Sequence, residues 1–170
     1  MLISCQNPPQ GAAAQQSWDE YLMSQMPLLG HRNWIVIADM AYPLQSGNGI
    51  TTLYADESYT DVVAKVKKMI DDSPHVFAHI YRDKELSFIS EEDMPGVGAL
   101  KEQMTRICGP EAQSVMHEDL IKRLDEAGKL YSVVIIKTPL TMAYTTTFFE
   151  LDCAYWGAQK QARLDAALGK

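Results

Sequence analysis

Cysteine is scarce in this chain of 170 residues, whose three cysteines, Cys5, Cys108 and Cys153, are widely separated. An odd number of cysteines without a Cys-x-x-Cys pair suggests neither a disulfide framework nor a zinc knuckle. Long apolar runs are also missing. Even the apolar stretch 131–136 has only the length of a strand, far below the roughly 18 residues that span a bilayer. The sequence therefore predicts no disulfide, no metal site and no membrane span.

Positive charge is in deficit as well. The net charge is -7 and the sequence pI is about 5.0, so the summed field repels phosphate backbones and anionic membranes. Nucleic acid is thus not an expected partner. What the chain does contain is 46% hydrophobic and 22% charged residues, a composition typical of a soluble globular domain.

Several well-known motifs are absent too. The chain has no Gly-x-Gly-x-x-Gly, P-loop or nucleophile-elbow sequence, so dinucleotide-binding, nucleotide-binding and serine-hydrolase functions have no support. His75 and His79 are four residues apart, a spacing that suits a metal only on a helix. Their β-rich surroundings favour a strand instead, and we assign them no role.

The first 17 residues differ from the rest of the chain. Residues 2–5, Leu-Ile-Ser-Cys, have the shape of a lipoprotein cleavage box, and residues 6–16 form a tether rich in Pro, Ala and Gln. The cationic and hydrophobic parts of a signal peptide are missing. Residues 1–17 are therefore expected to be a disordered leader on a cytoplasmic protein. The alternative is a protein that is lipid-anchored at Cys5, if a signal peptide lies upstream.

Helices are expected in five places. Ser17 and Glu20 form a capping box that starts a helix at about Trp18. Ser58 caps a second helix, whose apolar residues recur at helical spacing. Further helices are expected over 98–107, over 118–127 with Gly128 as a left-handed cap, and over 157–168.

Strands are expected between these helices. The run 34–38 is continuously apolar, as in a strand that is covered on both faces. Residues 50–55 form a short strand, 75–81 and 85–89 a hairpin that turns at 82–84, and 131–137 and 145–151 two strands that pair with each other. The alternation predicts one α/β domain over 18–156, with a mixed or parallel sheet and helices on its faces, followed by a helical extension over 157–170.

Asp39 is the first candidate site residue. In open α/β sheets ligands lie beyond the carboxyl ends of the strands, and Asp39 ends the buried run. His31 precedes the same strand. A fold-back of the Gly30 turn, or a neighbouring subunit, is therefore needed to bring His31 and Asp39 together.

Three segments carry a family resemblance. Leu29-Gly30-His31, then residues 35–39 ending in Asp39, then Pro43 resemble the first signature of the D-ribose pyranase and L-fucose mutarotase family. Residues 143–146, with Tyr144, lead into the apolar strand and are similar to the second signature. His117-Glu118 resembles the His-Glu pair of the ribose-acting branch. The resemblance implies site roles for His31, Asp39, His117 and Tyr144.

The sequence also departs from the family pattern. Thr146 stands where the family has an Asn that hydrogen-bonds the sugar, and Ile121 replaces a lysine, with Lys122 displaced by one position and so rotated by about 100°. Residues 138–141 replace a Gly-rich turn, and the helix after Trp156 extends past the point where relatives end. Both Thr146 and Lys122 are retained as candidate substrate-binding residues.

The activity implied by the resemblance is an interconversion of the cyclic forms of a free monosaccharide such as ribose or fucose. A base takes the anomeric hydroxyl proton, an acid protonates the ring oxygen, and the ring opens and recloses without a cofactor. His31 would transfer the proton, Asp39 would orient it or bind a hydroxyl, and His117 and Tyr144 would hold or protonate the ring side. Family members form rings in which neighbouring subunits share each pocket, which implies a homo-oligomer.

Two alternatives stay open. The same scaffold can serve as a non-catalytic monosaccharide-binding protein, an interpretation that Thr146 and the displaced Lys122 favour. The candidates also have structural explanations: His31 as a structural residue beside a Gly turn, Asp39 as a turn residue, His117 as a solvated residue at a helix start, and Tyr144 as a core or interface residue.

Overall fold

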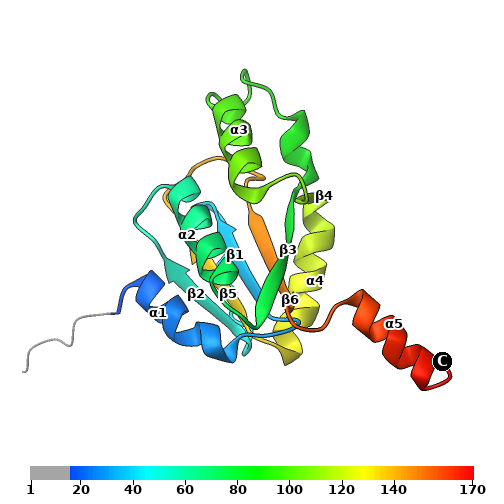
Figure 1. The fold of residues 1–170 in the computed structure, drawn as a ribbon. Coiled ribbons are helices and arrows are strands. Elements are labelled where there is room, and N and C mark those ends of the chain that lie inside the picture. The colour runs from blue at the N-terminus through cyan, green and yellow to red at the C-terminus, as the bar shows by residue number, and fades with distance from the viewer. Residues whose placement is uncertain (1–15) are drawn as a thin grey trace, which may run out of the picture.

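The computed structural model describes residues 16–170, and the proposed leader and the Cys5 anchor lie almost wholly outside them. Six strands form one sheet in the order β2-β5-β1-β6-β3-β4 (Figure 1). The strands are β1 (Trp34–Ala38), β2 (Ile50–Tyr54), β3 (Val76–Asp83), β4 (Gln113–Val115), β5 (Val133–Lys137) and β6 (Thr147–Cys153). β5 pairs in parallel with β1 and β2, and β3 with β4, whereas β6 runs antiparallel to β1 and β3. The expected mixed sheet is confirmed.

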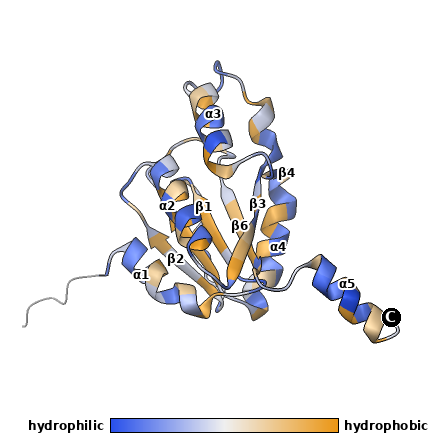
Figure 2. Cartoon of the chain, in the orientation of Figure 1, coloured by the Kyte–Doolittle hydropathy of each residue, from blue (hydrophilic) through white to orange (hydrophobic). Residues whose placement is uncertain are grey.

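Helices cover both faces of the sheet. The α-helices are α1 (Trp18–Gln25), α2 (Tyr59–Asp71), α3 (Val97–Cys108), α4 (His117–Leu130) and α5 (Ala158–Ala167), and two 3-10 helices are η1 (Met26–Leu28) and η2 (Lys84–Phe88). Buried residues of α1, α2 and α3 pack with Ile35 and Ile37 on one face, while those of α4 pack with Trp34 and Val36 on the other. Figure 2 shows the apolar colour concentrated in the strands between these layers.

Local sequence signals explain most of these elements. The Ser17–Glu20 capping box is present in both directions, and Ser58 accepts the backbone N–H of Asp61 at the start of α2. All five residues of β1 are buried because helices cover both sides of this strand. None of the helices among residues 16–170 combines the length and apolarity needed to cross a bilayer.

The predicted hairpin over 75–89 is wrong. Arg82 and Asp83, expected in its turn, are the last residues of β3, where Arg82 pairs with Ser114 of β4 and Thr147 of β6. The chain then turns into η2 instead of a returning strand, and Leu86 of η2 is buried. Tertiary pairing on both sides of β3 thus overrode the local turn signal of three consecutive charged residues.

Two smaller predictions were also wrong. The helix expected to stop at Gly128 continues to Leu130. Gly128 is there because a Cβ atom at this position would lie 3.0 Å from the Ile50 side chain of β2. The strand expected over 145–151 pairs with β1 and β3 rather than with β5, since β1 lies between them. The final helix, α5, forms as expected and buries none of its residues; it points away from the sheet (Figure 1).

Candidate functional site

A hollow of about 620 Å³ lies beyond the carboxyl end of β1. Asp39, His117 and Tyr144 all line it, although they come from the loop after β1, the start of α4 and the loop before β6. The N–H of Met40 donates to the carbonyl of Leu140 at 2.8 Å and so ties the two loops together. The three residues therefore converge at the carboxyl end of β1, the edge of the sheet at which the sequence placed Asp39.

Asp39 is buried and holds its own loop in shape. Its Oδ1 accepts the backbone N–H of Ala41 at 2.7 Å, the arrangement of an Asx turn. The side chain thus has the structural role that was the alternative interpretation, while it also lines the hollow. A carboxylate has further acceptor sites beyond one such bond, so Asp39 can also accept a ligand hydroxyl.

His117 is fixed by two carboxylates. Its backbone N–H, at the first turn of α4, donates to both carboxylate oxygens of Glu85 at 3.1 Å. Its ring Nδ1 lies 3.0 Å from Oδ1 of the buried Asp83. The hydrogen bond to Asp83 raises the pKa of His117, and partial burial opposes this effect. Burial raises the pKa of Asp83, and its bond to His117 opposes that rise.

Tyr144 projects its ring edge-on to His117, with 5.7 Å between the ring centroids. Its backbone lies in the left-handed region, with a φ of 55°. Within residues 16–170, Tyr144 and Arg32 are the two non-glycine residues with a positive φ. Such a conformation is unfavourable for a residue with a Cβ atom and is concentrated at functional sites. With 42% of its surface exposed, the ring is available to a ligand in the hollow.

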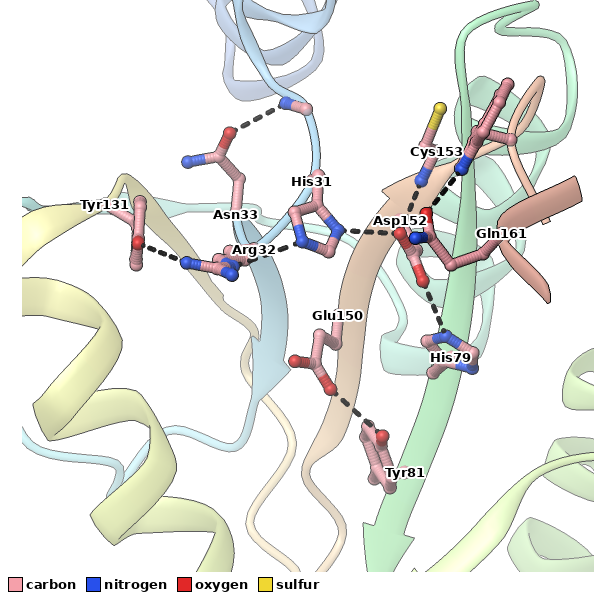
Figure 3. A network of polar contacts seen from close by, with 12 residues as sticks. His31, Arg32, Asn33, His79, Tyr81, Tyr131, Glu150, Asp152, Cys153 and Gln161 are labelled. Atoms are coloured by element: carbon pink, nitrogen blue, oxygen red, sulfur yellow. Dashed lines mark hydrogen bonds and ion pairs between the residues drawn. The ribbon is translucent and has the colours of Figure 1, made fainter. Parts of the chain in front are cut away.

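His31 lies at the other end of β1, in the network shown in Figure 3. Its Nδ1 is 2.6 Å from Oδ1 of Asp152, whose Oδ2 is 3.2 Å from Nε2 of His79. Burial raises the pKa of Asp152, but the N–H of Cys153 and the two imidazoles together bring this pKa below its usual value. Arg32 Nε donates to His31 Nε2 at 3.1 Å, so both ring nitrogens are engaged.

Residues 32–38 separate His31 from Asp39, and the five of them in β1 alone span about 16 Å at the usual rise of a strand. The Gly30 turn does not fold back, and one chain does not bring the two residues together. Of the two routes considered from sequence, only a neighbouring subunit remains.

The other two candidates do not line the hollow of Asp39. Thr146 is only 1% exposed. The ammonium group of Lys122 lies 3.3 Å from the carboxylate of Asp119. Lys122 lines a separate hollow together with Arg32 and Trp34. The displacement of this lysine by one position therefore has a structural consequence, because the 100° rotation points it away from His117.

Sequence reasoning missed Asp83, Glu85 and Tyr42. Tyr42 lines the hollow, and its buried hydroxyl has no hydrogen-bond partner within residues 16–170. Burial raises the pKa of Tyr42 well above its usual value, with the nearby Asp125 as the next cause. Asp83 is a carboxylate at the end of a strand, the same pattern that identified Asp39. The predicted hairpin placed Asp83 in a turn, so this pattern was not recognised. Over the same described range, no group of three or more His, Cys, Asp or Glu residues is placed to hold a metal ion.

Comparisons with known proteins support the fold. No protein-family model matches the chain, and no curated protein matches it in sequence. The Bacillus subtilis RbsD structure, solved with D-ribose, superposes with a TM-score of 0.57 at 14% identity, over 83% of this chain and 98% of that one. The Streptococcus pneumoniae fucose mutarotase, solved with L-fucose, gives a TM-score of 0.52 at 19% identity over 78% of this chain and 91% of its own. The chain thus has the RbsD/FucU-like fold.

Proposed function

We propose that the protein binds a free monosaccharide in the hollow lined by Asp39, His117 and Tyr144, and interconverts the cyclic forms of that sugar. One observation carries the proposal. Three polar groups from distant parts of the chain converge at the carboxyl end of β1, on a fold shared with a ribose-bound RbsD and a fucose-bound mutarotase. A hollow of about 620 Å³ lies within the size range usual for small-molecule sites.

The proposed roles follow from the contacts. Tyr144 presents an aromatic ring to the apolar face of a sugar, and Asp39 accepts one of its hydroxyls. His117 donates Nδ1–H to Asp83, and no residue within 16–170 bonds its Nε2, which is then the atom that exchanges a proton with the substrate. Because the bond to Asp83 raises the pKa of His117, its protonated form persists closer to neutral pH and can serve as the acid at the ring oxygen.

His31 enters this proposal only through a second subunit. In a ring assembly the His31–Asp152 pair of one protomer would face the hollow of its neighbour and act as the base at the anomeric hydroxyl. In that case Arg32 must release Nε2 of His31. A homo-oligomer with shared pockets is thus part of the proposal, and the reaction transfers only protons, with no cofactor.

Exchange between anomers, followed by NMR saturation transfer, tests the activity. Ribose and fucose should exchange faster with the protein than without it, and His117→Asn and Tyr144→Ala should each reduce the excess rate by about 10²-fold or more. Lys129→Gln, a change on the exposed surface of α4, should leave the rate unchanged. If no monosaccharide exchanges faster with the wild type, the enzymatic proposal fails.

Complementation tests the shared pocket. His31→Ala and Tyr144→Ala subunits would be inactive alone but active when co-expressed, because about a quarter of randomly mixed pockets then combine a wild-type His31 with a wild-type Tyr144. Recovery near a quarter of the wild-type rate supports the shared site. No recovery in isolated mixed oligomers would confine the chemistry to one chain.

A non-catalytic sugar-binding function is the second candidate. The burial of Thr146 and the position of Lys122 favour it, because neither residue supplies the contact that the resemblance implied. Saturable binding of a monosaccharide that is lost in Tyr144→Ala, without any acceleration of anomer exchange, would identify this function.

A further inference from the structure

Another pocket, of about 400 Å³, lies on the opposite side of β3 from the α4 layer. Two basic residues, Arg82 and Lys101, line it, together with Ser87, Thr105 and Ser114. These five residues come from β3, η2, α3 and β4. None of them belongs to the proposed sugar site.

The backbone explains how these groups meet. Arg82 and Ser114 are register partners of the parallel β3–β4 pair, so their side chains lie on the same face of the sheet. Tyr81 packs in the α4 layer, so Arg82 points to the layer of α3. Lys101 and Thr105 are one turn apart on α3 and therefore lie on the same side of that helix.

One donor of Arg82 is unsatisfied among the described residues. Its Nε–H is buried and has no hydrogen-bond partner within residues 16–170, and no ion pair is formed by Arg82 in the same range. A buried guanidinium N–H without an acceptor is energetically unfavourable. Lys101 donates to the carbonyl of Ile89 at 2.7 Å, which holds this second ammonium group at the pocket while leaving its other two N–H donors free.

The acidic lining of the pocket is limited to Asp83. Its Oδ1 contacts Nδ1 of His117 on the side of the sugar hollow, and its buried Oδ2 has no hydrogen-bond partner within residues 16–170. Two cations, the side chains of Ser87 and Ser114, and one carboxylate therefore surround the pocket, whereas the Thr105 hydroxyl donates to the carbonyl of Lys101 at 2.8 Å. This donor set suits a ligand with several acceptor oxygens and negative charge, because guanidinium and hydroxyl groups bind such oxygens with charge-assisted hydrogen bonds.

We propose that the pocket between β3, η2, α3 and β4 binds a tetrahedral oxyanion, either free phosphate or the phosphoryl group of a small phosphate monoester. Arg82 supplies the main charge-assisted contact, Lys101 a second positive charge, and Ser114 and Ser87 neutral donors. The proposal does not depend on the sugar site, because no residue lines both pockets.

Isothermal titration with inorganic phosphate, at ionic strength held constant with chloride, tests this site. One saturable site is expected, and Arg82→Gln and Lys101→Gln should each weaken binding by about tenfold or more. Lys129→Gln serves as the matched control, because it removes a charge from α4 on the other face and should not change binding. Sugar binding should survive in Lys101→Gln, whereas Tyr144→Ala should lose sugar and retain phosphate.

Titrations with other ligands identify what the site binds, and further variants report on the pocket if one variant does not fold. Sulfate should bind with a similar affinity because it has the same shape. If glycerol 3-phosphate binds more tightly than phosphate, the phosphate monoester is the ligand; equal affinity identifies the free oxyanion. Should Arg82→Gln not fold, Lys101→Gln and Ser114→Ala still report on the pocket. No saturable binding at tens of millimolar phosphate, or binding that is unchanged in these variants, would overturn the proposal.

Discussion

Nδ1 of His117 lies 3.0 Å from Oδ1 of Asp83, and Asp83 is only 2% exposed. A partly exposed imidazole at the hollow is thereby connected to a carboxylate inside the protein. The pair resembles the His–carboxylate arrangements in which the acid fixes the tautomer and orientation of the ring. The first prediction follows from this contact.

Asp83→Asn should lower the pKa of His117, because the hydrogen bond to Asp83 is the largest cause that raises it. An NMR titration of the His117 ring resonances measures this shift. Asp72→Asn, at the exposed residue that caps the end of α2, should have no effect. A pKa of His117 that stays the same in Asp83→Asn would show that the pair does not control its protonation.

The same pair should make stability depend on pH. When folding raises the pKa of a group, the group stabilises the folded state at pH values below its unfolded-state pKa. This stabilisation is lost as the pH rises through the folded-state pKa. Both His117 and Asp83 have raised values. The free energy of unfolding of the wild type, relative to Asp83→Asn, should therefore fall as the pH increases from acid through neutral. Chemical denaturation at a series of pH values measures it, and a rising difference would contradict the assignment.

Tyr144→Gly should be more stable than Tyr144→Ala by about 1 kcal/mol, because only glycine adopts a positive φ without a steric penalty. Both variants should lose sugar binding with the ring. The matched pair at the exposed Tyr155, which does not have a positive φ, should show no advantage for glycine. Urea denaturation gives the comparison, and equal stability of the two Tyr144 variants would argue against backbone strain at the hollow.

Gly49→Ala should destabilise the protein by about 1 to 3 kcal/mol, as overpacking does. A Cβ atom at Gly49 would lie 2.5 Å from the carbonyl oxygens of Gly128 and Tyr131, which are backbone atoms that cannot rotate away. Gly30→Ala is the control, since nothing lies within 4 Å of the equivalent Cβ. Thermal melting compares the two variants. Equal melting temperatures would mean that the α4 end can move away from residue 49.

Removal of residues 157–170 should change the free energy of unfolding by less than about 0.5 kcal/mol, because α5 buries none of its residues. Circular dichroism and denaturation of the truncated chain test this expectation. A large loss of stability would show that α5 packs against another subunit, and that 157–170 is more than an extension.

The local signals in the sequence were sufficient where neighbouring residues decide the structure. The Ser17–Glu20 box placed the start of α1, and the uninterrupted apolar run placed β1 and put Asp39 at its end. Helical periodicity located α2. These features depend on hydrogen bonds and side-chain spacing within one segment, so they can be derived without knowledge of the fold.

Tertiary structure decided what depends on pairing between distant segments. Strand pairing on both sides of β3 extended this strand through Arg82 and Asp83 and removed the predicted hairpin. The same pairing placed Asp83 behind His117. The Gly30 turn did not fold back, so His31 contacts Asp152 at the far end of β1 from Asp39. Side-chain chemistry therefore identified candidate residues, whereas the sheet order determined which of them meet, because contacts across strands have no signature within a single segment.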